Sequence, residues 1–398
     1  MQEAAEARPV WASIDLDALG HNARRAIGCA DGRAVIGVVK ADGYGHGAAA
    51  IARALLGAGV ERLAVVSVAE GAALRRAGVV APVLLLGGLS DPAAAERAAK
   101  WSLTPVVHDA AGLEIARAHG RAAAPLAVEV EVDTGMHRMG AAPDAAPRLL
   151  RAIVEAPELT LSGVFTHLAC ADAADARTSR DQVAAFAARL REAELGAASP
   201  LDVHVANSAG LLRREEIEGA VPDLVTTAVR PGLMLYGVSP YADRSAEALG
   251  LEPVMTLAAR VVAVRSVRKG DAVGYGAEWR AERDTRVATL PLGYADGIPR
   301  AAAGKGAVHL AGAMRPIVGR VSMDYAVVEV GEAPVSPGDV ATVFGRAPDG
   351  RRVPVERFAA AAGTIGYEIL VGVGARVPRR IARPGPAAGA ATAVDAAV

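Results

Sequence analysis

The sequence predicts an α/β protein, a (β/α)8 TIM barrel followed by a mainly β domain. Between residue 12 and about residue 240, short apolar or β-branched runs alternate with Ala/Arg/Leu-rich stretches of helical periodicity. Eight such runs occur over roughly 230 residues, and a (β/α)8 barrel usually takes about 250. After Gly250 the helical periodicity gives way to strand-like segments separated by turns. A doubly wound sheet is the alternative interpretation of the same alternation.

The stretches between the runs, such as HGAAAIARALLGAG and EGAALRRAG, place apolar residues three and four apart and end on glycine, as helices do. We expect the eight barrel strands at 34–39, 63–68, 83–87, 103–107, 127–132, 161–166, 202–206 and 224–229. The barrel would then occupy 12–250 and the β domain 251–385, with one helix near 355–362. Residues 386–398 are rich in Pro, Gly and Ala without a core pattern, which predicts a disordered tail.

The composition excludes several classes of protein. Of 398 residues, 52% are hydrophobic and 22% charged, so the chain has enough apolar surface for a core. The 43 basic and 44 acidic residues nearly cancel, which argues against nucleic acid or an anionic membrane as a partner. Two cysteines make no disulfide framework, and no Cys/His cluster has zinc spacing, so we expect no metal. The first ten residues lack the features of an export signal, and no run is apolar enough to span a bilayer. We therefore expect a soluble, cytoplasmic protein.

Polar residues gather where the predicted barrel strands end. Barrel enzymes build their sites at the carboxyl ends of the strands, so these residues are expected to share one rim. They are Lys40 and Tyr44 after the first strand, Asp133 and Arg138 after the fifth, His167 after the sixth, Asn207 and Ser208 after the seventh, and Arg230, Pro231 and Gly232 after the eighth.

Lys40 is the most informative of these residues. The chain has only four lysines among its 43 basic residues, so arginine is the default cation. A lysine in the barrel mouth, partly desolvated, has a lowered amine pKa and is able to form a Schiff base with a carbonyl or with pyridoxal phosphate. A solvated strand-end lysine is the alternative interpretation.

The other rim residues also have two interpretations each. The loops NSAG and RPGLMLYG resemble barrel phosphate sites, but they also suit ordinary turns. In VEVEVDTG, alternation places Glu129, Glu131 and Asp133 on one face, where they need a cation. Arg138 is the nearest candidate, and a polar barrel layer paired with other arginines is the alternative. His167 suits either a ring-stacking role or a satisfied buried histidine.

The motifs taken together resemble the pyridoxal-phosphate-dependent alanine racemase family over residues 12–380 or so. VVKADGYGHG is similar to its cofactor-lysine signature and DTGMHRMG to its substrate-arginine loop. Further similar segments follow in the family's order: FTHLACAD, HVANSAGLLR, VRPGLMLYG, VGYGAEW, LPLGYADG, VGRVSMD and GTIGYEI.

The resemblance implies a role for each matching residue. Lys40 would hold pyridoxal 5'-phosphate and act as the base on the D-alanine face, while Tyr275 from the partner of a head-to-tail homodimer would be the base on the L-alanine face. Inverting a chiral centre needs one base on each side, in agreement with this pair. The remaining cofactor contacts would be Tyr44, Asn207, Ser208, Gly232, Leu233 and Tyr367, with Arg230 at the pyridine nitrogen and His167 near the ring. Substrate contacts would be Arg138, the backbone at Met323, and Tyr294 at the entrance with Asp324 nearby.

The chain departs from the family pattern at Glu131. Many members carry there a lysine that becomes carbamylated and braces the substrate arginine. We predict that Glu131 orients Arg138 directly, through a water or through another side chain. The resemblance implies interconversion of L- and D-alanine for peptidoglycan synthesis. The alternatives are a racemase of serine or a broader range of amino acids, a decarboxylase of the same plan, and a non-catalytic pyridoxal-phosphate carrier. Arg230 argues against the decarboxylase, and Tyr275 against the carrier.

Overall fold

The computed structural model describes residues 8–195 and 201–382. The predicted tail at 386–398 lies outside the described residues. The chain divides into two compact units. The barrel unit comprises Leu19–Glu252 and Thr364–Val373, and the β unit comprises the chain up to Ala18, Pro253–Gly363 and the chain from Gly374.

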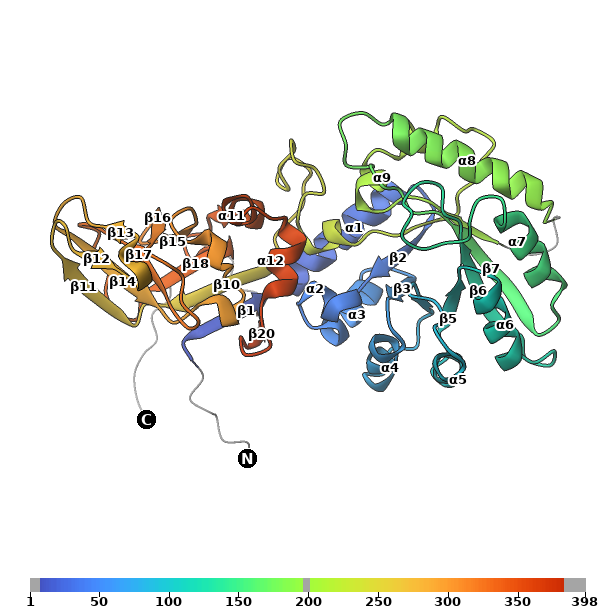
Figure 1. The fold of residues 1–398 in the computed structure, drawn as a ribbon, viewed down its shortest axis with the longest axis horizontal. Coiled ribbons are helices and arrows are strands. Elements are labelled where there is room, and N and C mark those ends of the chain that lie inside the picture. Colours follow the sequence, from blue (N-terminus) through green and yellow to red (C-terminus); the bar gives the residue numbers. More distant parts are fainter. Residues whose placement is uncertain (1–7, 196–200, 383–398) are drawn as a thin grey trace, which may run out of the picture. The chain divides into compact units, whose positions relative to one another are not determined.

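The barrel unit contains the predicted closed barrel of eight parallel strands (Figure 1). The last strand pairs with the first, Ala34 opposite Ala228, and this pairing closes the barrel. The strands are β2 (Ala34–Val38), β3 (Arg62–Val65), β4 (Val83–Leu85), β5 (Thr104–Val107), β6 (Leu126–Glu131), β7 (Leu159–Phe165), β8 (Asp202–His204) and β9 (Ala228–Val229). Each strand overlaps an expected run, and the predicted fold class is confirmed.

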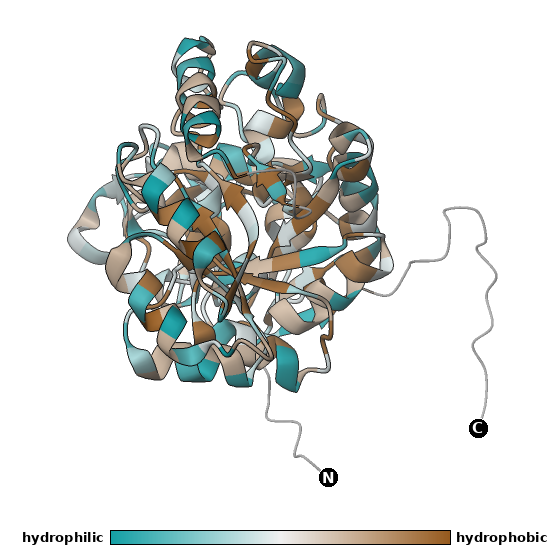
Figure 2. Cartoon of the chain, turned by 90° about the vertical axis from the view of Figure 1, so that its right-hand side faces the viewer, coloured by the Kyte–Doolittle hydropathy of each residue, from teal (hydrophilic) through white to brown (hydrophobic). Residues whose placement is uncertain are grey.

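Helices follow the strands as the periodicity predicts. They are α1 (Leu16–Ala30), α2 (Lys40–Tyr44), α3 (Ala48–Gly57), α4 (Val68–Arg76), α5 (Pro92–Lys100), α6 (Ala110–His119), α7 (Ala146–Glu155), α8 (Arg177–Ala193), α9 (Ser208–Leu212), α10 (Arg214–Glu218), the 3-10 turn η1 (Leu233–Tyr236) and α12 (Gly366–Gly372). Figure 2 shows apolar strands surrounded by helices with hydrophilic outer faces. Strand β6 is buried on both sides, since Val128 and Val130 are covered as fully as Glu129.

The β unit is built on one large, mostly antiparallel sheet in the order β11-β14-β17-β16-β15-β18-β10-β1-β20, with β19 paired to β18. Its elements are β1 (Val10–Ile14), β10 (Met255–Arg260), β11 (Ala263–Val267), β12 (Ala272–Val273), η2 (Tyr275–Ala277), β13 (Trp279–Arg280), β14 (Thr285–Leu290), η3 (Tyr294–Asp296), η4 (Arg300–Ala302), β15 (Ala307–Leu310), β16 (Ala313–Val318), β17 (Ala326–Glu329), β18 (Val340–Arg346), β19 (Arg352–Val353), α11 (Val355–Ala362) and β20 (Arg379–Ile381). The expected helix near 355–362 is α11.

Two segments, which contain β1 and α12, belong to a different unit from the stretches of chain next to them in sequence. Strand β1 overlaps the start of the expected barrel range at residue 12, yet it pairs with β10 and β20 in the β unit, with Val10 opposite Ala259. Helix α12 falls within the expected β domain but packs on the barrel unit. A Cβ on Gly45 would lie 2.5 Å from the Leu370 oxygen, so the absence of a side chain at Gly45 allows this approach.

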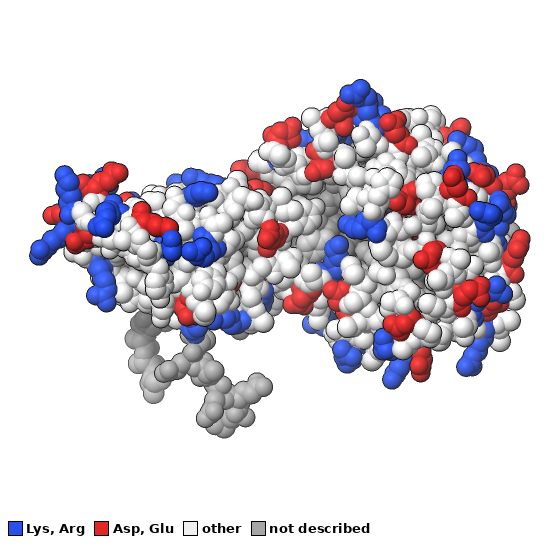
Figure 3. All heavy atoms as spheres, in the orientation of Figure 1, with Lys and Arg blue, Asp and Glu red and all other residues white. Residues whose placement is uncertain are grey.

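Charges are mixed on the molecular surface. On the face drawn in Figure 3, Lys and Arg side chains are interspersed with Asp and Glu side chains. Within residues 8–195 and 201–382, no helix is long and apolar enough to cross a membrane.

Candidate active site

Lys40 lies at the carboxyl end of β2, as the first residue of α2. The turn after it is sharp, because Ala41 and Asp42 have positive φ values of 51° and 53°. Glu70 holds this turn by accepting the Ala41 N–H at 2.8 Å, and the Asp42 carboxylate accepts the Ala48 N–H at 2.8 Å. Strained backbone of this kind is typical of functional loops. The turn therefore holds Lys40 in a defined position at the mouth of the barrel.

Burial and nearby charges shift the pKa values of Lys40 and His167. Burial lowers the pKa of Lys40, the Arg138 charge lowers it further, and Glu70 opposes them. Burial also lowers the pKa of His167 to about 3, with contributions from Arg230, Arg138 and Lys40 in that order. His167 is therefore neutral, and the rim carries positive charge from three residues. Such a rim suits an anionic ligand and an amine that is easily deprotonated.

Arg230 follows β9 directly and is buried. Its guanidinium donates to the carbonyls of Thr166 (2.7 Å) and His204 (3.0 Å), and its carbon lies 4.5 Å from the centre of the Phe165 ring. Burial lowers its pKa to about 10, so Arg230 keeps its charge at neutral pH. The sequence identified Arg230 as a candidate, and the structure shows that several backbone oxygens orient it.

His204, which the sequence interpretation did not single out, connects Arg230 to an acidic group. Its Nδ1 accepts a hydrogen bond from Arg230, and its Nε2 lies 2.9 Å from Glu129 Oε2. Arginine is only a donor, so the proton of the neutral ring must be on Nε2, facing Glu129. Glu129 also lies 3.8 Å from Arg62. Glu129 is thus close to the cation Arg62 and is connected through His204 to the cation Arg230. These contacts agree with the interpretation of Glu129 as part of a polar barrel layer paired with arginines.

The loop that carries Arg138 is shaped by its own residues. Asp133 accepts the N–H groups of Gly135 and His137, each at 3.0 Å, so its carboxylate is used within the loop rather than on Arg138. At the base of the loop, Ala141 N–H donates to the Glu131 carbonyl at 2.7 Å. This closure sets the direction in which the loop leaves β6.

Glu131 is buried at the base of this loop, and its nearest ionic partner is His108 Nδ1 at 3.5 Å. Within the described residues, no hydrogen bond or ion pair joins Glu131 to Arg138, so the direct form of the predicted brace is not found. Burial raises the pKa of Glu131, while the Arg230 and then the Arg138 charge lower it. The Glu131 carboxyl is thus influenced by the Arg138 charge without a direct contact between the two side chains in the described residues.

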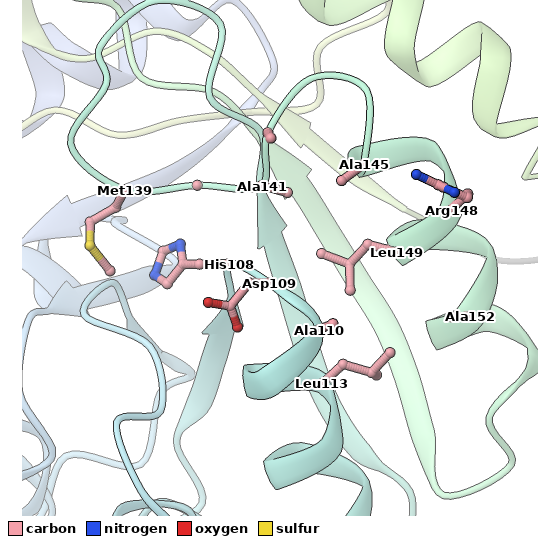
Figure 4. Close-up of a pocket in the computed structure, with 12 residues that line it drawn as sticks. His108, Asp109, Ala110, Leu113, Met139, Ala141, Ala145, Arg148, Leu149 and Ala152 are labelled. Atoms are coloured by element: carbon pink, nitrogen blue, oxygen red, sulfur yellow. The ribbon is translucent and has the colours of Figure 1, made fainter.

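A cavity of about 680 Å³ lies behind the Arg138 loop (Figure 4). His108 and Asp109 at the end of β5, the loop residues Met139 and Ala141, and residues of α7 line it. His108 thus lies between this cavity and Glu131. The cavity walls are largely apolar, as the many alanines suggest, and the polar groups of the candidate site lie on the barrel rim instead.

The loops after β8 and β9 form a cradle of hydrogen-bond donors. Ser208 Oγ accepts the N–H groups of Gly232 (2.9 Å) and Met234 (3.3 Å), so its own proton is directed elsewhere. A Cβ on Gly232 would lie 2.5 Å from the Tyr44 hydroxyl, so only glycine leaves this space open. Asn207 has a local task, since its side chain accepts the Gly210 N–H at 3.0 Å and caps α9. Leu233 is buried at the start of η1.

Two tyrosines complete this cradle. The Tyr44 ring stacks on Tyr236 at 4.5 Å and lies 6.1 Å from the ring of Tyr367 on α12. Burial raises the pKa of Tyr44, and burial raises the pKa of Tyr367 to about 12. Both phenols are therefore protonated at neutral pH and able to donate a hydrogen bond.

The remaining predicted residues lie on the β unit. Tyr275 is 72% exposed on η2, and Tyr294 and Met323 are about half exposed. Three loops join here. Arg320 lies against Gly276 beside Tyr275, and Tyr294 N–H donates to the Ser322 carbonyl at 3.0 Å. We call this group of loops, residues 273–278, 291–298 and 319–325, the tyrosine face. The Asp324 carboxylate is engaged by Arg376.

The fold and these contacts define a class of protein. It is a (β/α)8-barrel protein with a lysine of lowered pKa beside a donor-rich cradle, joined to a β unit that presents tyrosines. Comparison with known families gives the particular family. Residues 14–240 match the model of the alanine racemase N-terminal domain, and residues 254–381 match that of the C-terminal domain. The chain belongs to the alanine racemase family, a family of isomerases.

Individual relatives agree over nearly the whole chain. The chain is 38% identical to the alanine racemase of Sorangium cellulosum, covering 95% of this chain and all of that protein. It is 40% identical to that of Thioalkalivibrio sulfidiphilus, with 95% and 98% covered. Among solved structures, alanine racemase from Streptomyces lavendulae matches with a TM-score of 0.87 at 36% identity, over 95% of this chain and 98% of that one. The Pseudomonas aeruginosa enzyme gives 0.85 at 37% identity, over 94% and 100%.

Proposed function

We propose that this protein interconverts L-alanine and D-alanine with pyridoxal 5'-phosphate as cofactor, and so supplies D-alanine for peptidoglycan synthesis. The observation that carries the proposal is Lys40, an amine of lowered pKa held in a sharp turn on a cationic rim. An amine that gives up its proton readily is able to bond to the cofactor aldehyde and to serve as a base.

The barrel residues fit the cofactor. Ser208 has its proton available beyond two accepted N–H groups, and Tyr44 and Tyr367 remain protonated, so the cradle offers donors to a phosphate. The space beside Tyr44 exists because residue 232 is glycine. Leu233 would add its backbone, and Arg230 and His167 would lie at the ring. The structure shows Asn207 capping α9, so we propose that Asn207 acts by shaping the cradle.

When bound, the cofactor withdraws electrons from the substrate Cα and so weakens its C–H bond. Lys40 would then take or give the Cα proton on the D-alanine face, and Tyr275 on the L-alanine face. Arg230 donates hydrogen bonds but does not transfer its proton, because its pKa stays near 10 even when buried. An arginine here therefore limits electron withdrawal, which favours return of the proton over side reactions.

The substrate carboxylate would be bound by Arg138 and by the Met323 N–H. Arg138 offers a bidentate donor pair. Within residues 8–195 and 201–382, no hydrogen-bond acceptor is found for the Met323 N–H, whereas the Met323 carbonyl accepts the Ala295 N–H at 3.0 Å. An N–H without an acceptor among these residues, on a half-exposed residue, is an available anion donor. Tyr294 would line the entrance, and Asp324, held by Arg376, would set the loop.

We propose that the active form is a head-to-tail homodimer in which the tyrosine face of one subunit completes the barrel site of the other. Tyr275, Tyr294 and Met323 are large and exposed, and grouped exposed aromatic residues typically mark an interface. A cytoplasmic location is part of the proposal. It is supported by Cys29 and Cys170, which are both free thiols, as is usual in a reducing compartment.

Chiral chromatography of purified, cofactor-loaded protein tests the proposal. Incubation with L-alanine is expected to give an equal mixture of enantiomers, and incubation with D-alanine the same mixture. L-serine and L-lysine are expected to react much more slowly. Faster conversion of serine or lysine than of alanine would replace the substrate but keep the reaction. Unchanged enantiomers of all three amino acids would overturn the proposal.

A further inference from the structure

The β unit contains a fully buried aspartate, Asp296, to which the proposed reaction assigns no role. It is 0% exposed at the end of η3. Its carboxylate accepts Arg8 Nη1 at 2.6 Å, Arg376 Nε at 2.7 Å and the Gly293 N–H at 2.8 Å. Arg8 is bidentate, because its Nη2 lies 3.2 Å from the second oxygen. Charged pairs with this geometry are strong and directional.

The same two arginines reach the neighbouring loop. Arg8 Nη2 donates to the carbonyls of Pro291 (2.7 Å) and Asp324 (3.2 Å). Arg376 donates to the Asp324 carboxylate as well as to Asp296. Asp296 is therefore the centre of a cluster that joins loops 291–298 and 319–325 with the chain segments that precede β1 and β20. We call this group, Arg8, Asp296, Asp324 and Arg376, the Asp296 cluster.

The backbone of the two loops is in direct contact above the Asp296 cluster. Tyr294 N–H donates to Ser322 O, and Ala295 N–H to Met323 O, each at 3.0 Å. A Cβ on Gly293 would overlap the carbonyl oxygens of Ser322 and Met323, so no other residue allows this approach. The orientation of the Met323 peptide is thus fixed from the Asp296 side, and the Tyr294 ring follows the same turn.

We propose that Asp296 is a positioning residue, which through Arg8 and Arg376 holds the Met323 N–H and the Tyr294 ring where they receive the substrate carboxylate. This inference rests on the proposed function. The competing explanation is that the Asp296 cluster only stabilises the fold of the β unit. Removing one partner of a buried ion pair destabilises a protein, because the other charge is left buried without a partner. The two explanations differ in what happens to substrate affinity in the protein that remains folded.

Steady-state kinetics of Asp296→Asn in the cofactor-loaded enzyme separates them. Asparagine keeps the shape but removes the charge that aligns both arginines. We expect KM for L-alanine and the inhibition constant for acetate, a carboxylate without an amine, to rise about tenfold, the effect of one weakened hydrogen bond to a charged group. We expect kcat to stay within about twofold, because the bond is lost equally in ground and transition states.

Two further variants keep the test decisive. Asp284→Asn is the matched control, because Asp284 is exposed in the same unit and also accepts a backbone N–H, from Lys269 at 2.8 Å. It is expected to match the unsubstituted enzyme. If Asp296→Asn does not fold, Arg376→Lys decides by the same two constants, since lysine keeps the charge but loses the directed Nε bond.

Unchanged KM and acetate constants in Asp296→Asn, with or without a loss of melting temperature, would overturn the positioning role. A fall in kcat alone that follows the loss of folded protein would do the same. If the unsubstituted enzyme does not racemise alanine but still binds acetate, the proposed function fails, and acetate dissociation constants from calorimetry of the unsubstituted protein and Asp296→Asn decide the role of Asp296.

Discussion

Arg230 donates a hydrogen bond to Nδ1 of His204, and this contact connects the candidate cofactor arginine to a buried carboxylate. The opposite nitrogen of His204 lies 2.9 Å from Glu129 Oε2. Phe165 stacks on the His204 ring at 4.8 Å and also lies under Arg230. These contacts favour the His204 tautomer that carries its proton on Nε2, and they hold the Arg230 guanidinium in one orientation.

Glu129→Gln tests this chain of contacts. The glutamine keeps the shape but removes the charge that holds the His204 proton, so the free energy of unfolding should fall by about 1–3 kcal/mol. Chemical denaturation measures the change. Glu114→Gln is the control, because the side chain of Glu114 is 71% exposed. Equal stabilities of the two variants would show that Glu129 does not support the ring.

Lys40 is predicted to be the residue that bonds to the cofactor. Incubation with pyridoxal phosphate and reduction with borohydride should add the mass of the reduced cofactor to the peptide that contains Lys40. The reason is that an amine of lowered pKa attacks an aldehyde fastest. Lys40→Ala should lose the label and at least about a thousandfold in activity. Lys269→Ala, at an exposed lysine, should keep both. Labelling that persists in Lys40→Ala would reject the assignment.

Ser208→Ala is predicted to weaken the phosphate cradle. The change leaves the Gly232 and Met234 N–H groups without their acceptor and removes a donor to the phosphate. Cofactor affinity, measured by fluorescence titration, should fall by about ten- to a hundredfold, as for one or two hydrogen bonds to a charged group. Ser90→Ala, at an exposed serine whose hydroxyl donates to the Asp91 carboxylate, is the control. An unchanged affinity in Ser208→Ala would place the phosphate elsewhere.

His167 predicts how stability depends on pH. Its pKa is about 3 in the folded protein, against an ordinary value of 6.5, because burial and three nearby cations disfavour the charged ring. Below pH 6.5 the unfolded chain therefore binds a proton that the folded chain rejects, so stability should fall as the pH drops from 6.5 towards 3.

Melting temperatures of cofactor-free protein between pH 7 and pH 5 measure this dependence. His167→Gln should show a flatter profile over this range, and His21→Gln, at an exposed histidine, should keep the original slope. Identical slopes for His167→Gln and the unsubstituted protein would mean that the buried ring does not titrate as its surroundings require.

Local periodicity predicted the barrel well, because the alternation of buried strands and half-buried helices is present in each short stretch. It did not predict that β1 joins the sheet of the β unit or that α12 packs on the barrel unit. Those associations depend on contacts such as Val10 with Ala259 and Gly45 with Leu370, which no short stretch of sequence contains.

The candidate site shows the same division. The strand-end rule brought Lys40, His167 and Arg230 to one rim, because parallel strands end on the same side. It missed His204 and Asp296, whose importance depends on partners far away in sequence. His204 stands in the segment HVANSAG at the end of a predicted strand, so the strand-end rule had the signal to include it. Asp296 stands in the quoted segment LPLGYADG, but nothing in that segment shows that this aspartate is buried in a cluster, since one of its arginines, Arg8, is 288 positions away.

Proton exchange in heavy water tests the central claim, that Lys40 and Tyr275 act as bases on opposite faces. Proton NMR would follow the Cα proton of L-alanine and of D-alanine with the unsubstituted enzyme, Tyr275→Phe and Tyr325→Phe. The unsubstituted enzyme and Tyr325→Phe, a control at a half-exposed tyrosine of the same face, should exchange and invert both enantiomers. Tyr275→Phe should still exchange D-alanine through Lys40 while inversion and exchange of L-alanine slow by about a hundredfold or more. Equal racemisation by Tyr275→Phe and the unsubstituted enzyme would contradict the two-base account.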